Sequence, residues 1–295
     1  MLQYHIRVHI KKYLIMEGIY MIDKQQVKFH FSKNASNYNQ YAHIQKEMKD
    51  ILIKFMLQNN KDNIEIKNIL EIGCGTGYLT YALTEIFPSA HITAVDIAPG
   101  MIAEIKSKFT NNSVDFICID IEEMELNNTY DIVISNATFQ WFNHMPTTIK
   151  KLYTALNPNG MLCFSTFGEY TFRELNECFN KAKQALCIKE SIYSGQPFYS
   201  LNELTTLCKN AIETKANNNE ILIESREILK YEYFNNCKNF FYSIKKTGAN
   251  NSNKSNRSTS PTFIKKVIDL YNENFLENNK VKSTYHCLFY KIIKK

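Results

Sequence analysis

The chain has few glycines and prolines, the residues that interrupt helices and strands, and no closely paired cysteines that could cross-link a fold. Its 295 residues include 9 glycines, 6 prolines and a single tryptophan, Trp141. The 8 cysteines stand singly with no C-x-x-C pair, which excludes the usual zinc spacings and a disulfide framework. We therefore expect no metal site, and reduced thiols in a reducing, cytoplasmic compartment. No apolar run approaches the length that spans a membrane, so no membrane association is predicted.

Charge of one sign is in only slight excess. The 35 Lys and Arg residues outnumber the 29 Asp and Glu residues and leave a formal net charge of +6. This excess does not favour a nucleic-acid ligand. It fits either a solvated basic surface or the attraction of an acidic partner.

The N-terminal segment shows no regular pattern. Residues 1–20 mix basic and apolar side chains, but they lack the long apolar core and the cleavage site of a targeting peptide. Met16 and Met21 are plausible later starts. We interpret residues 1–26 as an extension that is disordered or wrongly assigned, although a short amphipathic arm fits the same residues. Residues 27–295 are expected to form a single, monomeric domain.

What the chain does have is a glycine-rich turn between two predicted strands. The sequence N-I-L-E-I-G-C-G-T-G occupies residues 68–77, and a second apolar strand at 91–95 leads into Asp96. Glycine at alternate positions lets the backbone approach a ligand closely. The helix predicted next presents free N–H groups to a carboxylate or phosphate, and Asp96 can accept hydrogen bonds from both hydroxyls of a ribose. A ribose-bearing cofactor is therefore expected here.

The spacing of the glycines discriminates between cofactors. A dinucleotide fold usually shows G-x-G-x-x-G, whereas this turn is G-x-G-x-G and carries Glu71 two residues before its first glycine. An acid beside the turn repels a pyrophosphate and suits an ammonium group. S-adenosylmethionine has an ammonium, a carboxylate and a ribose but no phosphate, and the motif resembles the first motif of class I S-adenosylmethionine-dependent methyltransferases. A dinucleotide, or a turn that binds nothing, is the alternative.

Predicted strands and helices alternate between residues 66 and 167, which is typical of a mostly parallel sheet covered on both faces. We predict a Rossmann-like α/β fold of the class I methyltransferase type, with a seven-stranded sheet and a small helical cap at about 169–212. A turn is expected at Asn157-Pro-Asn-Gly160, and a mobile polar loop at about 249–261. The predicted strands are 68–72, 91–95, 114–119, 132–135, 161–166, 220–233 and 281–293.

Residues at the ends of neighbouring strands complete the predicted cofactor site. Asp120 can accept a hydrogen bond from the adenine amino group while the Ile121 backbone reads the ring edge, or it is an exposed strand-end acid. Asn136 is expected to line the methionine portion. The predicted cofactor contacts are Glu71, Gly73, Cys74, Gly75, Gly77, Asp96, Ile97, Asp120, Ile121 and Asn136.

The acceptor side is marked by aromatic residues and one arginine. Tyr38 and Tyr41 can cap a pocket or pack as amphipathic helix residues, and Trp141 either walls the substrate side or packs against the sheet. No Ser-His-Asp or Cys-His arrangement is legible, and methyl transfer requires only alignment of nucleophile, methyl and sulfur. Arg173 can hold a substrate carboxylate bidentately, or pair with a neighbouring acid on a helix surface.

Several segments together resemble the malonyl-acyl-carrier-protein O-methyltransferase family of biotin synthesis. Three similar segments are F-S-K-N-A-x-x-Y-x-x-Y-A-x-x-Q at 31–45, S-N-A-T-F-Q-W-F at 135–142, and F-S-T-F-G at 164–168 with its T-F-R-E-L continuation. S-I-K-K-T-G-A-N at 243–250 and S-T-Y-H-C-L-F at 283–289 lie outside the general methyltransferase core and are the most diagnostic. The resemblance covers about residues 29–295.

The resemblance implies methylation of the free carboxylate of a malonyl thioester on acyl carrier protein, with S-adenosylmethionine as donor. Tyr38 and Arg173 would serve the acceptor, and Phe198 would help to enclose the malonyl arm. The carrier is acidic in that family, so a basic rim is implied, with candidates Lys150, Lys151, Lys181, Lys183, Lys245 and Lys246.

Three other functions compete with this one. A small-molecule carboxyl methyltransferase of the trans-aconitate type shares the core and the substrate chemistry. A nucleic-acid methyltransferase is disfavoured by the mild charge and by the lack of an N-P-P-Y-like motif after the fourth strand. A cofactor-binding accessory subunit without an acceptor pocket is the non-enzymatic alternative.

Overall fold

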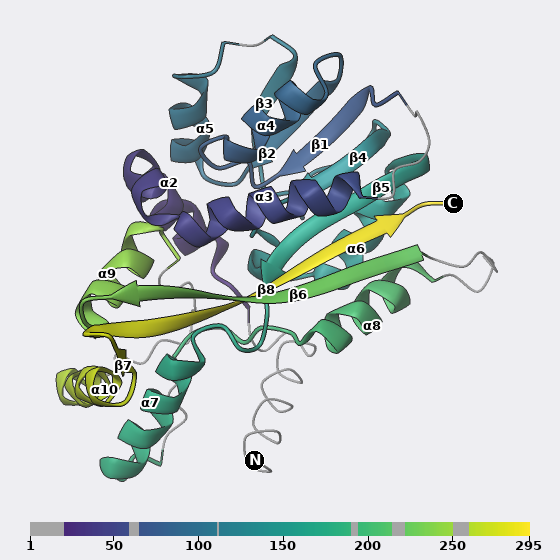
Figure 1. Ribbon diagram of the computed structural model, residues 1–295. Helices are drawn as coiled ribbons and strands as arrows, with labels where there is room; N and C mark the ends of the chain where they lie inside the picture. Colours follow the sequence, from purple (N-terminus) through teal and green to yellow (C-terminus); the bar gives the residue numbers. More distant parts are fainter. Residues whose placement is uncertain (1–20, 59–64, 111, 190–193, 214–221, 250–259) are drawn as a thin grey trace.

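The protein has an α/β fold built on one β-sheet that runs through the described part of the chain (Figure 1). Its strands are β1 (Asn68–Ile72), β2 (His91–Asp96), β3 (Val114–Cys118), β4 (Tyr130–Ser135), β5 (Leu156–Phe167), β6 (Leu222–Phe234), β7 (Leu276–Glu277) and β8 (Lys280–Ile293). They are ordered β3-β2-β1-β4-β5-β8-β6, with β7 paired to β8. The computed structural model describes residues 21–58, 65–110, 112–189, 194–213, 222–249 and 260–295.

The predicted mostly parallel sheet is confirmed. Strands β1 to β5 pair in parallel, whereas β8 runs antiparallel to both β5 and β6. The sheet has eight strands rather than the expected seven. The additional strand is β7, which forms a short hairpin with β8 because Asn278 and Asn279 both adopt positive φ, at 49° and 62°. Asparagine tolerates this left-handed conformation, which a two-residue hairpin turn requires.

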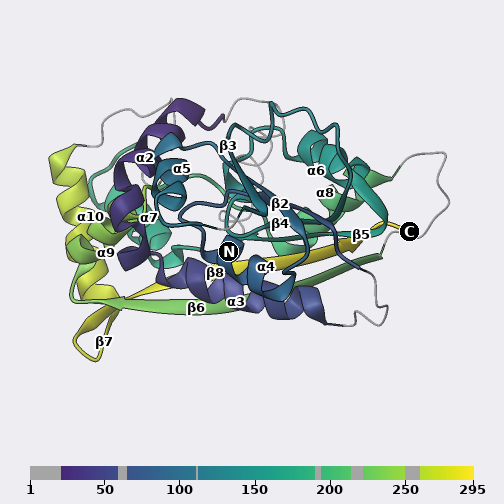
Figure 2. The same cartoon turned by 90° about the horizontal axis from the view of Figure 1, so that it is seen from above.

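Helices cover both faces of the sheet (Figures 1 and 2). Helices α3 and α4 pack on one face, and α6 and α8 pack on the other. Helix α2 lies beside α5 and α9 at the edge where the parallel strands end. The helices are α2 (Lys24–Tyr41), α3 (His43–Leu57), α4 (Tyr78–Ile86), α5 (Pro99–Lys106), α6 (Met145–Thr154), α7 (Arg173–Ala185), α8 (Leu201–Ile212), α9 (Cys237–Lys246) and α10 (Pro261–Asn274), with a 3-10 turn η1 (Phe139–Trp141). None of the helices in these described ranges is long and apolar enough to cross a membrane.

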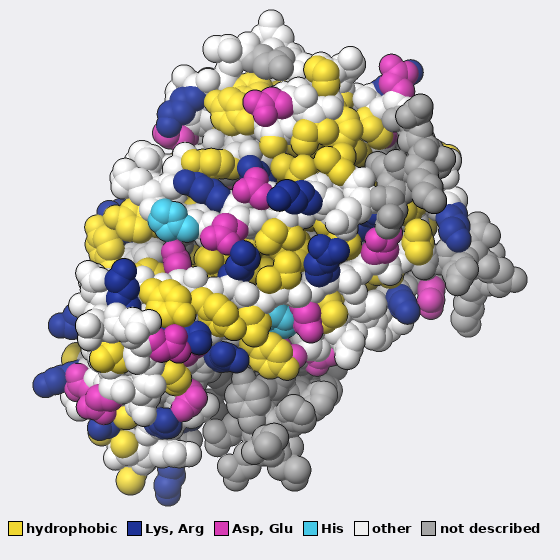
Figure 3. All heavy atoms as spheres, in the orientation of Figure 1, with side chains coloured by type: hydrophobic (Ala, Val, Ile, Leu, Met, Phe, Trp, Pro, Cys, Tyr) yellow, Lys and Arg dark blue, Asp and Glu magenta, His cyan; other side chains and the backbone are white. Residues whose placement is uncertain are grey.

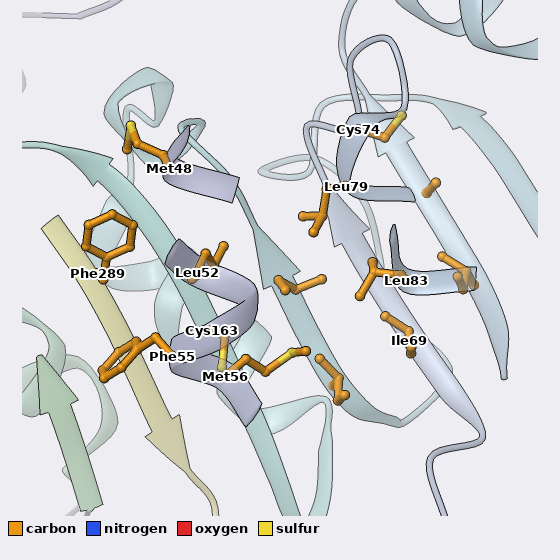
Figure 4. Packing of buried hydrophobic residues seen from close by; sticks show 14 of the residues in the cluster. Met48, Leu52, Phe55, Met56, Ile69, Cys74, Leu79, Leu83, Cys163 and Phe289 are labelled. Carbon is orange, nitrogen blue, oxygen red and sulfur yellow. The ribbon is translucent and has the colours of Figure 1, made fainter. Parts of the chain in front are cut away.

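The α3 side of the core follows from helical spacing. Met48, Leu52 and Phe55 recur at intervals of three and four, so they share one face of the helix, and all three are buried against the sheet (Figure 4). On the opposite face of the sheet, Phe164 stacks between Phe139 and Tyr290, with ring centroids 3.9 and 4.9 Å away. The sheet is therefore fixed from both sides close to the ends of β4 and β5.

The expected cap at 169–212 is divided in two. Helix α7 packs with α9 and α10 in a separate cluster that includes Phe179, Phe240 and Phe263. Helix α8 instead covers the sheet, because Leu204 and Cys208 form an apolar stripe facing the β5 and β8 side chains. Helix α7 also begins at Arg173, later than expected, since Phe172 before it adopts a left-handed φ of 57°.

Three further boundaries differ from expectation. Helix α2 begins at Lys24, inside the expected extension, because the Asp23 side chain caps its first turn. Residues 1–20 lie outside the described part of the chain, as do 250–259 of the expected polar loop, while Pro261 already begins α10. The Asn157-Pro-Asn-Gly160 segment is a bulge within β5 rather than a turn before it, since the pairing moves from Tyr130 with Leu156 to Ile132 with Met161.

Candidate functional site

A pocket opens where the parallel strands β1, β2 and β4 end. It encloses about 660 Å³ of space, part of it open to solvent. Carboxyl ends of parallel strands are the usual ligand edge of such sheets. The predicted site residues that line the pocket are Tyr38, Gly73, Gly75, Asp96, Ile97, Asp120, Ile121 and Asn136. Residues that are distant in sequence therefore converge here.

The glycine turn shapes one wall of the pocket. Gly73, Gly75 and Gly77 all adopt positive φ, at 71°, 54° and 90°. A side chain on Gly73 would collide with Thr138, and one on Gly77 would collide with Ile105. A side chain on Gly75 would meet no protein atom within 4 Å. The first and third glycines thus serve close packing, while Gly75 leaves open space for a ligand.

Asp96 is held in a defined orientation at the end of β2. Its Oδ2 accepts a hydrogen bond from the Gly75 N–H at 2.9 Å, and its Oδ1 accepts one from the Ala98 N–H at 2.8 Å. Burial raises the pKa of Asp96 to about 6, although both backbone hydrogen bonds act in the opposite direction. Each oxygen keeps a further lone pair, so the carboxylate can still accept hydrogen bonds from the hydroxyl groups of a ribose.

The opposite end of the pocket contains Asp120 and Ile121. The Asp120 Oδ1 accepts a hydrogen bond from the Glu122 N–H at 3.0 Å, and its Oδ2 lies 3.0 Å from the Lys24 ammonium. Lys24 itself lines the pocket, together with Phe142. Asp120 is therefore a paired carboxylate in the pocket wall rather than an exposed strand-end acid.

Helix α2 forms the wall facing the sheet. Tyr38 lies near Asp96, and its pKa is raised by burial first and by the Asp96 charge second. Trp141 also lines the pocket and meets the Phe31 ring edge-on at 5.5 Å. Tyr41 instead packs against Tyr242 of α9, with ring centroids 5.9 Å apart. Of the two tyrosines, only Tyr38 reaches the pocket.

Asn136 stands at the methionine end of the predicted site. Its amide donates to the Gln45 carbonyl at 2.9 Å, and its amide oxygen accepts from the Ser165 hydroxyl at 2.7 Å. These bonds connect α3, β4 and β5 at one point. Asn136 thus lines the pocket with a side chain whose orientation is already fixed.

Glu71, Cys74 and Gly77 are not among the lining residues. Glu71 is 1% exposed, and neither of its carboxylate oxygens accepts a full hydrogen bond, even though Thr80 lies beside it. Burial raises the pKa of Glu71 to about 8, so its carboxyl is mostly neutral at pH 7. In this conformation Glu71 is not the charged neighbour of an ammonium group that the sequence suggested.

Two predicted acceptor residues also lie outside the cofactor pocket. Arg173 is exposed at the start of α7, and its Nε lies 3.6 Å from Glu174. Phe198 meets Phe167, at the end of β5, with ring centroids 6.3 Å apart. Glu174 anchors this region, because its carboxylate accepts a hydrogen bond from the Thr284 N–H of β8 at 3.0 Å.

Sequence reasoning missed several wall residues. They come from α2, α5 and the segments after β4, and the residues of α2 show no clear amphipathic period that could have indicated them. They are Lys24, Val27, Phe31, Met101, Thr138 and Phe142. Among the described residues, no group of three or more His, Cys, Asp and Glu side chains is arranged to hold a metal ion.

Comparison with known proteins gives this site a family. Residues 69–160 match a methyltransferase domain model. The malonyl-[acyl-carrier protein] O-methyltransferase of Priestia megaterium is 48% identical over 274 residues, which cover 93% of this chain and 99% of the relative. The enzyme of the same name from Acetivibrio thermocellus is 45% identical and covers 91% of this chain and 93% of its own length.

A solved structure supports the fold. The plantazolicin methyltransferase BpumL in complex with SAH superposes with a TM-score of 0.51 at 16% identity, and covers 97% of this chain and 98% of its own. The sequence identity of the two curated relatives extends over almost the whole chain, well beyond the methyltransferase core. The chain therefore belongs to the malonyl-[acyl-carrier protein] O-methyltransferase family.

Proposed function

We propose that the protein transfers a methyl group from S-adenosylmethionine to the free carboxylate of a malonyl thioester on acyl carrier protein. The observation that carries this proposal is the 48% identity to a relative of that name over 99% of the relative's length. Esterification removes the charge from the malonyl end. A chain-elongation system built for apolar ends could then extend it, as an early step toward biotin.

The pocket residues fit the cofactor. Gly75 leaves room for it, the oriented Asp96 carboxylate would accept the ribose hydroxyls, and Asp120 would accept the adenine amino group. When bound, the cofactor supplies a methyl group that is already activated on a sulfonium. The work of the protein is then to bind, to orient and to exclude water, because the transfer requires alignment rather than a protein nucleophile.

A carboxylate acceptor suits the polar groups of this pocket. Among its described lining residues the only carboxylates are Asp96 and Asp120, and there is no histidine. Both acids are engaged at the nucleoside end, so neither is placed to deprotonate an amine or a phenol at the methionine end. A carboxylate arrives deprotonated and needs no general base.

Arg173 and Phe198 are proposed to serve the acceptor. The Arg173 Nε faces Glu174, whereas the outer edge of its guanidinium has no ion pair among the described residues. That edge can bind a carboxylate through two parallel hydrogen bonds. Phe198, against Phe167 at the end of β5, would supply the apolar side of the malonyl arm.

The lysines of the predicted basic rim differ in their partners, and Lys150 of α6 has no ion pair with the described residues. Lys151 donates to three backbone carbonyls, and Lys181 pairs with Glu177 at 2.7 Å. Lys245 and Lys246 of α9 have no ion pair with the described residues, and neither has Lys33 of the neighbouring α2. On the face shown in Figure 3, basic and acidic side chains are interspersed.

The sequences of α2 and α9 contain no Asp or Glu. We define the α2/α9 patch as Lys33, Lys245 and Lys246 with the exposed rings of Phe29 and Tyr242. Lys33 lies over the Phe29 ring and Lys246 over the Tyr242 ring, at 5.7 and 5.2 Å from the centroids. We propose this patch, close to the pocket wall formed by α2, as the docking surface for an acidic carrier.

Complementation tests the proposed function. A strain that requires biotin because it lacks this methyl transfer should grow without biotin when it expresses the protein, and should not grow when it expresses Asp96→Ala. Failure of the wild-type protein to restore growth, with the protein present in soluble form, would favour a small-molecule carboxyl methyltransferase of the trans-aconitate type.

A further inference from the structure

The chain at the start of α2, residues 22–24, is fixed beside Asp120 at one end of the pocket. Ile22 is buried, and its backbone is bound on both sides by one side chain. Its N–H donates to the Asn143 Oδ1 at 2.7 Å, and its carbonyl accepts from the Asn143 Nδ2 at 3.0 Å. Asp23 then caps the helix, so Lys24 enters the pocket wall from a fixed backbone.

The Lys24 ammonium lies between two carboxylates. It is 3.0 Å from the Asp120 Oδ2 and 2.6 Å from the Glu122 Oε2, and the side chains of both acids are at most 10% exposed. It also lies 5.7 Å from the centre of the Phe142 ring. A cation shared by two partly buried acids is held far more firmly than one in a solvent-exposed ion pair.

Glu122 is itself immobilised. Its Oε2 accepts from the Asn143 N–H at 2.9 Å, and its Oε1 accepts from the His144 N–H at 2.6 Å, just before α6. Asn143 therefore connects the Ile22 backbone to the acid that holds Lys24. The four residues Ile22, Lys24, Glu122 and Asn143 form one closed network around Asp120, which we call the Lys24 network.

This network determines which lone pairs of Asp120 are available. The Oδ1 accepts from the Glu122 N–H and from the Lys24 ammonium, at 3.0 and 3.3 Å, and the Oδ2 lies 3.0 Å from the same ammonium. A carboxylate held between a backbone donor and an ammonium is an acceptor only and cannot rotate freely. Such a group accepts a hydrogen bond from an exocyclic amino group, and it repels an oxo group at the same position of the base.

We propose that Lys24 is a positioning and specificity-determining residue that fixes Asp120 to read the 6-amino group of adenine. The inference rests on the proposed cofactor. Without the ammonium, only the Glu122 N–H would orient the Asp120 carboxylate, and the charge of the neighbouring Glu122 carboxylate would repel it. Asp120 would then be displaced from the position in which it accepts from the 6-amino group, so discrimination between adenine and hypoxanthine would weaken.

Calorimetric binding of two ligands tests the proposal. S-adenosylhomocysteine and S-inosylhomocysteine differ only at one edge of the base: position 6 carries an amino or an oxo group, and N1 accepts a hydrogen bond in adenine but donates one in hypoxanthine. We expect Lys24→Met to bind the adenosyl compound at least tenfold more weakly and to lose most of the preference for it. Lys28→Met, one turn further along α2 and without an ion pair in the described structure, is the matched control and should bind as wild type.

A second variant separates positioning from folding. Asn143→Ala removes the Ile22 contacts without touching the ligand, and should narrow the adenosyl preference less than Lys24→Met does. Equal weakening for both ligands, or adenosyl binding by Lys24→Met within twofold of wild type, would overturn the proposal. Neither result depends on the acceptor, so failure here is distinct from failure of the proposed methyl transfer.

Discussion

The Asp96 carboxylate accepts a hydrogen bond of 2.9 Å from the Gly75 N–H, and both residues line the cofactor pocket. This contact connects the end of β2 to the middle of the glycine turn after β1. It fixes the acid relative to the one glycine of this turn whose missing side chain leaves open space. Turn and acid therefore act as one unit, and changes in either should affect cofactor binding before they affect the fold.

Binding of S-adenosylhomocysteine should weaken as pH falls through about 6. The pKa of Asp96 is raised to about 6 in the free protein, and the ribose hydroxyls donate to its ionised form, so protonation competes with the ligand. Below that pH the affinity should fall by up to about tenfold per pH unit. Calorimetry from pH 5 to 8 measures this. Asp96→Asn should bind S-adenosylhomocysteine weakly, with an affinity that does not depend on pH over this range, and Asp96→Ala should not bind it. Retained affinity in Asp96→Ala would exclude the ribose contact.

The three glycines should differ in what their substitution by alanine changes. Gly75→Ala places a methyl group in ligand space, so its melting temperature should fall only modestly, from a backbone strain of roughly 1–2 kcal/mol, while ligand affinity falls more than tenfold. Gly73→Ala and Gly77→Ala collide with Thr138 and Ile105 and should lower the melting temperature further. Thermal melts with and without S-adenosylhomocysteine distinguish the two effects. A ligand response in Gly75→Ala equal to that of wild type would contradict this assignment.

Glu71 should make the ligand-free protein less stable as pH rises. Its folded pKa of about 8 lies above the ordinary value of 4.5, so the folded state retains a proton that the unfolded state releases. Stability from this group is complete below about pH 4.5 and is lost progressively up to about pH 8. Glu71→Gln should remove that decline. The difference between its melting temperature and that of wild type should therefore increase from pH 5 to pH 8. Loss of ligand binding by Glu71→Gln at pH 7 would instead indicate that Glu71 is the charged partner of the ammonium group of the ligand.

Arg173→Ala should raise the KM for the malonyl thioester about tenfold or more and leave the KM for S-adenosylmethionine unchanged. The reason is that a bidentate contact to the acceptor carboxylate would be lost while the cofactor pocket stays intact. Lys181→Ala, on the same helix and paired with Glu177 at the surface, is the control and should change neither value. If Arg173→Ala leaves both KM values unchanged, its only role is the Glu174 contact.

Charge reversal at the α2/α9 patch should affect only carrier-bound substrate. Lys33→Glu and Lys245→Glu should raise the KM for malonyl-acyl-carrier-protein several-fold, with the difference shrinking at high salt because the ion pairs are screened. The KM for malonyl-coenzyme A, which lacks the protein surface, should not change. Lys181→Glu is the matched reversal on another surface helix. An equal effect of all three variants would show that net charge, rather than this patch, is sensed.

The parts of the fold that follow from local patterns could be predicted from the sequence. Apolar runs define the central strands, and three glycines followed by a helix and an acid define the nucleoside end of the site. The bulge at Asn157–Gly160 was missed because the same residues favour a free turn, and only the pairing of Leu156 and Met161 with β4 on either side reveals that the strand continues through them. β7 was missed because a strand of two residues is too short to show an alternation of apolar and polar side chains.

Tertiary contacts determine the remainder. Lys24 lies in a stretch without amphipathic periodicity, and it becomes part of the pocket through Asn143, more than a hundred residues away. Glu71 looks like a pocket acid from its distance to the first glycine, yet the strand directs it to the buried side of the turn, beside Thr80. Arg173 carries no sequence signal that separates a substrate contact from its pairing with Glu174.

The most direct measurement is transfer of a labelled methyl group from S-adenosylmethionine to purified malonyl-acyl-carrier-protein, with the carrier analysed intact by mass spectrometry. The account predicts one base-labile methyl ester on each malonyl group, no label on unacylated carrier or on acetyl-carrier, and loss of the reaction in Asp96→Ala. An unmodified malonyl carrier, together with label on a free small-molecule carboxylate such as trans-aconitate, would contradict it.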